Sequence, residues 1–75
     1  MPKPIKNPPP ELVAAAESAL QSNMHPTKAA EVLRYLMFRR SLEQNGADLT
    51  AAGLRFGMSR QAIQQQILVL ESRLT

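Results

Sequence analysis

The stretch that decides the fold runs from Leu49 to Leu74 and reads LTAAGLRFGMSRQAIQQQILVLESRL. Its first part contains three small residues in succession, Ala51 to Gly53, and Gly57 follows one turn later. Small residues allow two helices to cross closely, and glycine can adopt the positive φ that a tight turn requires. Ser59 is a favourable N-cap for the helix that follows. The stretch therefore predicts two helices joined by a tight turn, with Phe56 and Met58 filling the space beside it.

The last predicted helix has two distinct faces. A core stripe recurs at spacings of four, three and four residues, and consists of Ile63, Ile67, Leu70 and Leu74. A polar stripe lies about 120° away around the helix, and consists of Gln61, Gln64, Gln65 and Leu68. In the major groove of DNA, arginine can pair with guanine and glutamine with adenine. The residues predicted to read bases are therefore Arg60, Gln61, Gln64 and Gln65, although a solvated glutamine-rich face is the alternative.

This segment resembles the helix-turn-helix of LysR-type transcriptional regulators. The resemblance rests on LTAA at 49–52, GMS at 57–59 and the pattern A-I-x-x-Q-I-x-x-L-E at 62–71. It implies that the residues directly after Ser59 enter the major groove and that Thr50 contacts the DNA backbone. Gly53 departs from the motif, which prefers alanine there, and should loosen its helix by up to about 1 kcal/mol. The chain also stops before the wing and linker helix of that family.

The whole chain also resembles the DNA-binding half of StbA-type plasmid stability proteins. The resemblance rests on the arm NPPPEL, on the helices that precede the motif, and on LTAAGLRFGMSRQAIQQQI. It implies a role in plasmid segregation and in regulation of the protein's own operon, through binding to repeated DNA sites.

The segment before Leu49 predicts an arm and two further helices. Residues 1–10 hold five of the six prolines and should form an extended or disordered arm. A first helix is expected over 11–23, with Pro10 in its first turn; its apolar face comprises Leu12, Val13, Ala16 and Leu20. A second is expected over 28–45, capped by Thr27 or His25 and closed by Gly46 in a left-handed conformation. The stripe that this second helix is expected to bury comprises Ala29, Leu33, Leu36 and Met37, with Val32 and Tyr35 as further candidates. Its charged residues are expected mostly on the other side.

The third predicted helix spans 49–56, with Asp48 as its N-cap, and the fourth reaches Arg73 or Leu74. Together the four helices predict an all-α domain over 11–75, a compact orthogonal four-helix arrangement. Because the last helix has no stop signal, we expect the chain to be the amino-terminal part of a longer protein.

Side chains that could contact phosphates lie around the predicted turn and on the second helix. They are Thr50, Arg55, Ser59, Arg39 and Arg40. For the last two, a solvated helix face is an equally good interpretation. Lys3 and Lys6 could reach a minor groove from the arm, but a free tail is the favoured interpretation.

Composition narrows the classes of function. Nine Lys and Arg against six Asp and Glu give a net charge of +3, which suits a nucleic-acid partner. The chain has no cysteine and a single histidine, so we expect no disulfide, metal site, cofactor or enzymatic activity. No stretch is long and apolar enough for a membrane span or a signal peptide, and we expect a cytoplasmic protein.

These features together predict sequence-specific binding of double-stranded DNA by a transcriptional regulator or a plasmid stability protein. A helix-turn-helix this small usually needs two copies on DNA, either as a dimer or as neighbours on direct repeats. One alternative is a helical protein-interaction module of the antitoxin or adaptor kind, using the surface around Leu68 and Val69. The other is an accessory domain that binds nucleic acid without specificity.

Overall fold

The computed structural model describes residues 6–75 and contains four α-helices and no strand within that range. The helices are α1 (Pro10–Gln21), α2 (Pro26–Gln44), α3 (Leu49–Leu54) and α4 (Arg60–Leu74). The all-α prediction is confirmed, and each helix lies within a few residues of its predicted bounds. Lys3 lies outside the described residues, and Lys6 is exposed in the segment before α1.

The ends of the helices follow the local signals of the sequence. Proline occupies the first turn of α1 and of α2, where its missing N–H costs nothing. Of the two predicted caps of α2, it is His25 that acts, because its Nδ1 accepts a hydrogen bond from the Thr27 N–H at 3.1 Å. Gly46 follows α2 with a φ of +62°, as the left-handed cap predicts. Asp48 caps α3 and Ser59 caps α4, both as predicted.

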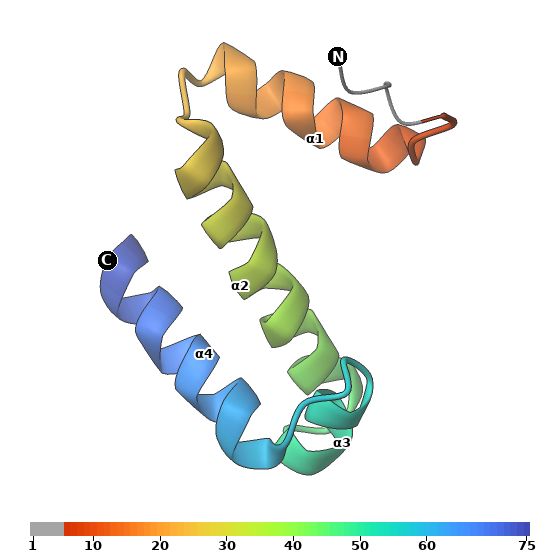
Figure 1. Ribbon diagram of the computed structural model, residues 1–75, viewed down its shortest axis with the longest axis vertical. Helices are drawn as coiled ribbons and strands as arrows, with labels where there is room; N and C mark the ends of the chain where they lie inside the picture. Colours follow the sequence, from red (N-terminus) through yellow and green to blue (C-terminus); the bar gives the residue numbers. More distant parts are fainter. Residues whose placement is uncertain (1–5) are drawn as a thin grey trace.

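The core is formed by three of the four helices. α2 and α4 lie side by side and run in opposite directions, and α3 closes the end where they come together (Figure 1). The buried apolar side chains come from these helices alone, and they are Phe38, Ala52, Ile63, Ile67 and Leu70. The predicted core stripe of α4 is confirmed, with Leu74 packed at its end.

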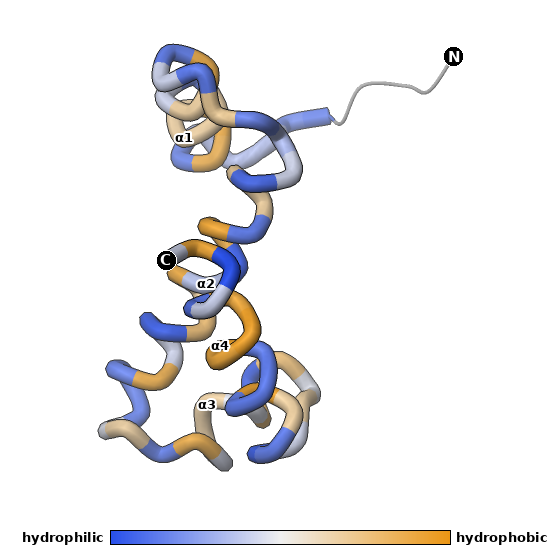
Figure 2. Tube along the Cα trace, turned by 90° about the vertical axis from the view of Figure 1, so that its left-hand side faces the viewer, coloured by the Kyte–Doolittle hydropathy of each residue, from blue (hydrophilic) through white to orange (hydrophobic). Residues whose placement is uncertain are grey.

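α1 takes no part in this core, and the prediction of a compact four-helix arrangement is wrong in that respect. None of its residues is buried, and it projects from the amino-terminal end of α2, at the end of the molecule opposite α3 (Figures 1 and 2). Its predicted apolar face is largely exposed, with Leu20 at 73%. The radius of gyration is 14.3 Å, against about 11 Å for a compact domain of this length.

The predicted buried stripe of α2 is wrong for its four main residues, whereas the further candidates Val32 and Tyr35 are half-buried and Tyr35 packs against the core. Leu33, Leu36 and Met37 are exposed, and Ala29 is only half-buried. The buried residues of α2 are Phe38 and Ser41, which face α3 and α4. α2 carries apolar side chains on both sides, and it is the side of Phe38 that α3 and α4 cover.

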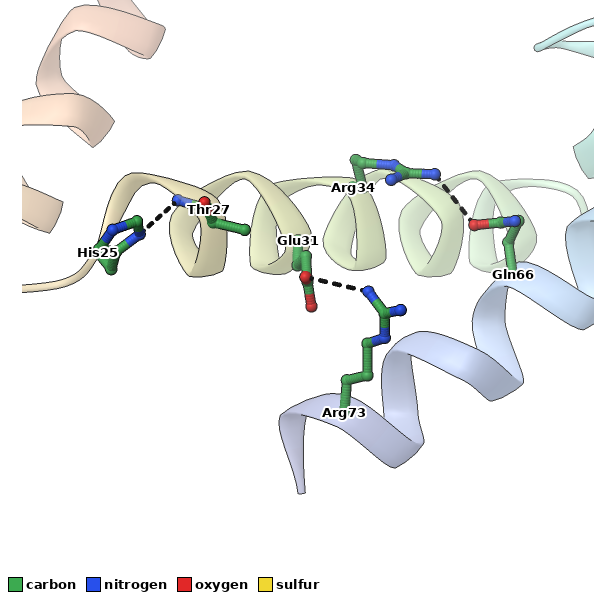
Figure 3. Close-up of polar contacts among 6 residues, drawn as sticks. All are labelled: His25, Thr27, Glu31, Arg34, Gln66 and Arg73. Atoms are coloured by element: carbon green, nitrogen blue, oxygen red, sulfur yellow. Dashed lines mark hydrogen bonds and ion pairs between the residues drawn. The ribbon is translucent and has the colours of Figure 1, made fainter.

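Polar side chains also join α2 to α4. Arg73 donates to the Glu31 carboxylate at 3.3 Å, and Arg34 donates to Oε1 of Gln66 at 3.0 Å (Figure 3). Between these two pairs, the Tyr35 hydroxyl donates to the Glu71 carboxylate at 3.4 Å. These contacts hold the amino-terminal half of α2 beside the carboxy-terminal half of α4.

Candidate nucleic-acid interface

The crossing of α3 and α4 is closer than any side chain at Gly53 would allow. A Cβ atom at this position would lie 2.6 Å from the Met58 carbonyl oxygen and 3.3 Å from that of Ser59. It would also touch Ile63 at 3.4 Å. Ala52, next to Gly53, is fully buried. The small residues therefore allow the close approach that their pattern predicted. Glycine is required at position 53 because the backbone of the turn lies too near for a Cβ atom, whereas the sequence had indicated only that it weakens the helix.

The turn between the two helices is fixed by backbone hydrogen bonds and by packing. The N–H groups of Phe56 and Met58 both donate to the Gly53 carbonyl oxygen, at 2.9 and 2.8 Å. Gly57 has a φ of +65°, which confirms the expected left-handed residue. The Phe56 ring packs edge-on against Phe38 of α2, with 5.5 Å between the ring centroids, and Met58 packs against the same core. The start of α4 is thus held in one orientation relative to α2 and α3.

Two sets of side chains leave the first turns of α4 in different directions. Ile63 and Ile67 point into the core, whereas the candidate base-reading residues are all exposed. Those residues are Arg60, Gln61, Gln64 and Gln65. Ser59 begins the helix, and its Oγ accepts from the Ala62 N–H at 3.1 Å. The structure thereby brings the four residues together at the amino-terminal end of one exposed face.

Gln66 belongs to a different set from its neighbours, although four of the six residues from 61 to 66 are glutamines. It is half-buried, and its amide oxygen accepts from Arg34 of α2 (Figure 3). Gln66 is offset by 200° from Gln64 around the helix, at 100° per residue. The glutamine run therefore divides into an exposed group of three and one residue that joins two helices.

The candidate phosphate-contacting residues lie on both sides of the turn. Thr50 and Ser59 are exposed, and a hydroxyl that accepts one hydrogen bond can still donate another. Arg55 directly follows α3 and donates to the Gln44 amide oxygen at 2.6 Å. A hollow of about 170 Å³ is lined by both Arg55 and Arg40, so the structure brings these two cations close to one another. Arg39 is half-buried on α2.

The ion pairs leave most of these cations without a carboxylate partner. Within residues 6–75, ion pairs join only Arg40 to Glu43 and Arg73 to Glu31. The first is solvent-exposed, at 3.7 Å, and such pairs stabilise little. Arg60 and Arg55 have no carboxylate partner in this part of the chain, so their charges can attract an external anion.

Ser41 is a structural residue that the sequence did not single out. It is buried, and its hydroxyl donates to the Ala52 carbonyl oxygen at 3.2 Å. This bond attaches α3 to α2 directly behind the α3–α4 crossing. A serine inside a predominantly apolar and charged helix gives no periodic signal, and only its position opposite α3 reveals its role.

Within residues 6–75, no cluster of three or more His, Asp or Glu side chains could hold a metal ion. In the same range, no helix is long and apolar enough to cross a membrane. The side chains that gather around the turn are amides, hydroxyls and guanidinium groups, which bind anions and base edges.

Comparison with protein-family models, with curated proteins and with solved structures finds no match to this chain. Its function must therefore be inferred from its own residues.

Proposed function

We propose that the chain binds double-stranded DNA sequence-specifically, through a helix-turn-helix formed by α3 and α4. The observation that carries the proposal is the exposed group at the start of α4, on a helix whose opposite face is fixed in the core. Arginine and glutamine are the side chains that recognise guanine and adenine in the major groove. A recognition helix of this kind contacts base edges with its amino-terminal residues. Arg60, Gln61, Gln64 and Gln65 occupy that part of α4.

Phosphate contacts would set the register of α4 in the groove. Thr50 and Ser59 can donate hydroxyl hydrogens, and Arg55 and Arg40 supply charge beside the turn. Contacts to phosphates position a protein on the duplex without reading its sequence. Arg39 could add to them from α2. On this proposal the protein acts as a transcriptional regulator or a plasmid maintenance protein, on an operator or on repeated sites.

The experiment that tests the proposal is selection of bound duplexes from a random library, followed by titration of the selected site. Binding should be specific and should weaken with increasing salt, because bound phosphates release their counterions. The same selected duplex and a scrambled duplex then serve for all variants. Equal affinity for both duplexes would favour the non-specific accessory domain, and no binding at low salt would favour the protein-interaction module.

Arg60→Ala sharpens this test. We expect it to lower affinity for the selected site by about 1–3 kcal/mol and to relax specificity at one base pair, since a bidentate contact to guanine would be lost. Arg73→Ala is the matched control, because Arg73 lies on the same helix at its other end, in an ion pair with Glu31. If Arg60→Ala weakens binding to both duplexes equally, Arg60 contacts a phosphate and does not read a base.

A further inference from the structure

The strongest feature outside the proposed interface is an apolar groove between α1 and the amino-terminal half of α2. It has a volume of about 500 Å³, and its only polar lining residues are two serines. We name it the α1–α2 groove; the lining residues that matter most here are Leu12, Ala16, Ala19, Ala29, Leu33 and Leu36. An amphipathic helix needs a partner for its apolar stripe, and within residues 6–75 nothing fills this groove. Leu12 and Leu36 are each about half exposed, at 48% and 52%.

The accessible surface of the chain is large for its mass. It amounts to 6190 Å², whereas a compact monomer of this mass exposes about 4,600 Å². Residues 6–9 and α1, in which no residue is buried, contribute to this excess. One partner in a standard protein interface gives up about 800 Å². Leu12, Leu20, Leu33 and Leu36 are 40–73% exposed, so α1 and the groove belong to the surface that a partner could cover.

Two rows that run along the walls of the groove, and past its lining at Glu11 and at Arg40, match each other when they are read in opposite directions. On α1, Glu11 is followed in the same row by Ala15 and Ala19, at intervals of four residues. On α2, Leu33, Leu36 and Arg40 form a row at intervals of three and four. Placed antiparallel, the rows bring carboxylate to guanidinium at one end and small alanines to large leucines along the rest.

The charges of α1 and α2 favour the antiparallel arrangement of the two rows. α1 carries two carboxylates and no basic residue, whereas α2 carries four basic residues against two acidic ones. Within its own chain α1 projects away from α2 (Figure 1), and Glu11 forms no ion pair with any described residue. The matching rows are therefore present in every copy but are not closed on each other.

We propose that the α1–α2 groove is the interface for a second copy of this chain. In the dimer, each α1 lies antiparallel along the α2 of the other copy, so the same contacts are made twice about a two-fold axis. Glu11 of one copy lies beside Arg40 of the other, and Leu36 is covered by the partner's alanines. Leu33 and Leu36 are exposed on a side of α2 that α3 and α4 do not cover, so this pairing leaves the exposed face of α4 uncovered. In the dimer Arg40 pairs with the partner's Glu11, and the phosphate contacts beside the turn then come from Arg55, Thr50 and Ser59.

Sedimentation equilibrium of the 75-residue chain over a wide concentration range tests the proposal. The apparent mass should rise twofold with concentration. Leu36→Glu, which places a charge in the groove, should keep the protein monomeric at every concentration, with an unchanged helical circular dichroism spectrum. Leu68→Glu is the control, because Leu68 is equally exposed on α4, outside the groove. A wild-type chain that stays monomeric, a dimer that survives Leu36→Glu, or one that Leu68→Glu also disrupts would overturn the assignment.

A charge exchange tests the antiparallel register. Glu11→Arg alone and Arg40→Glu alone each place like charges together twice in the homodimer, and each should raise its dissociation constant about tenfold. In a mixture of the two variants, both contacts become attractive again, so a heterodimer of near wild-type stability should form. If each variant dimerises as well as wild type, or if mixing restores nothing, the proposed register is wrong. The readout is mass and is independent of DNA binding.

Discussion

The two ends of this molecule are both rich in apolar side chains, but they differ in how many of these side chains are buried. The buried side chains lie where α2, α3 and α4 pack together, and they are Phe38, Ala52, Ile63, Ile67 and Leu70. The end formed by α1 and the first turns of α2 is equally rich in Leu and Ala, yet α1 buries none of them. What separates the two ends is the number of helices that meet. Three helices enclose a side chain, whereas two that diverge leave a groove.

The largest expected effect is a difference in the free energy of unfolding between a variant in the core and a variant in α1. Ile63→Ala removes a side chain that is fully buried between three helices, and we expect it to lower the free energy of unfolding by about 2–5 kcal/mol. Leu20→Ala removes a hydrocarbon of the same size from α1, where Leu20 is 73% exposed, and should change stability by no more than about 0.5 kcal/mol. Urea denaturation followed by circular dichroism measures both.

Stability in a chain this short is small in total, so Ile63→Ala should leave a substantial unfolded fraction even without denaturant. Should the two variants lose similar free energy, α1 would have to be packed in solution, and the comparison between the two ends would fail. Measurements at low protein concentration keep any self-association from contributing.

The next effect tests how closely α3 and α4 cross. Gly53→Ala should destabilise the protein by about 1–3 kcal/mol, because the new methyl group would overlap a backbone oxygen that cannot move alone. Helix propensity alone predicts the opposite sign, a gain of up to about 1 kcal/mol. Thermal melting decides between the two.

Gly57→Ala provides the control for the effect of adding a methyl group near the turn. A Cβ atom there would meet no heavy atom within 4 Å, but φ is +65°. Gly57→Ala should therefore lower the free energy of unfolding by about 1–2 kcal/mol through backbone strain alone. A Gly53→Ala variant as stable as wild type would mean that the turn lies farther from α3, and that the alanine preferred by LysR-type motifs fits here as well.

The contrast between the ends also explains which features the sequence could predict. The caps at His25, Asp48 and Ser59 and the left-handed glycines at 46 and 57 are set by residues within a few positions, and they were predicted correctly. The stripe of Ile63, Ile67 and Leu70 was also identified, because only one face of α4 has that period. These features are local, so the sequence around each one is sufficient.

The errors concern contacts between segments that lie far apart in the chain. α2 has one apolar row through Leu33 and Leu36 and another through Tyr35 and Phe38, and periodicity cannot say which of them α3 and α4 will cover. For the same reason, the exposure of α1 and the clash that alanine would cause at 53 could not be read from spacing. The bond between Arg34 and Gln66 joins residues 32 positions apart, and no local pattern predicts it.

The smallest expected change in stability concerns two glutamines of α4, Gln64 and Gln66. Gln64→Ala removes an exposed amide that has no structural role, so the melting temperature should stay within about a degree while affinity for the selected duplex falls. Gln66→Ala removes the acceptor of the Arg34 guanidinium, and should lower stability by about 0.5 kcal/mol while leaving DNA affinity unchanged. Thermal circular dichroism and titration with the same duplex give both quantities. If the two variants exchanged these effects, the face of α4 assigned to DNA would be the wrong one, because Gln64 and Gln66 lie on nearly opposite sides of the helix.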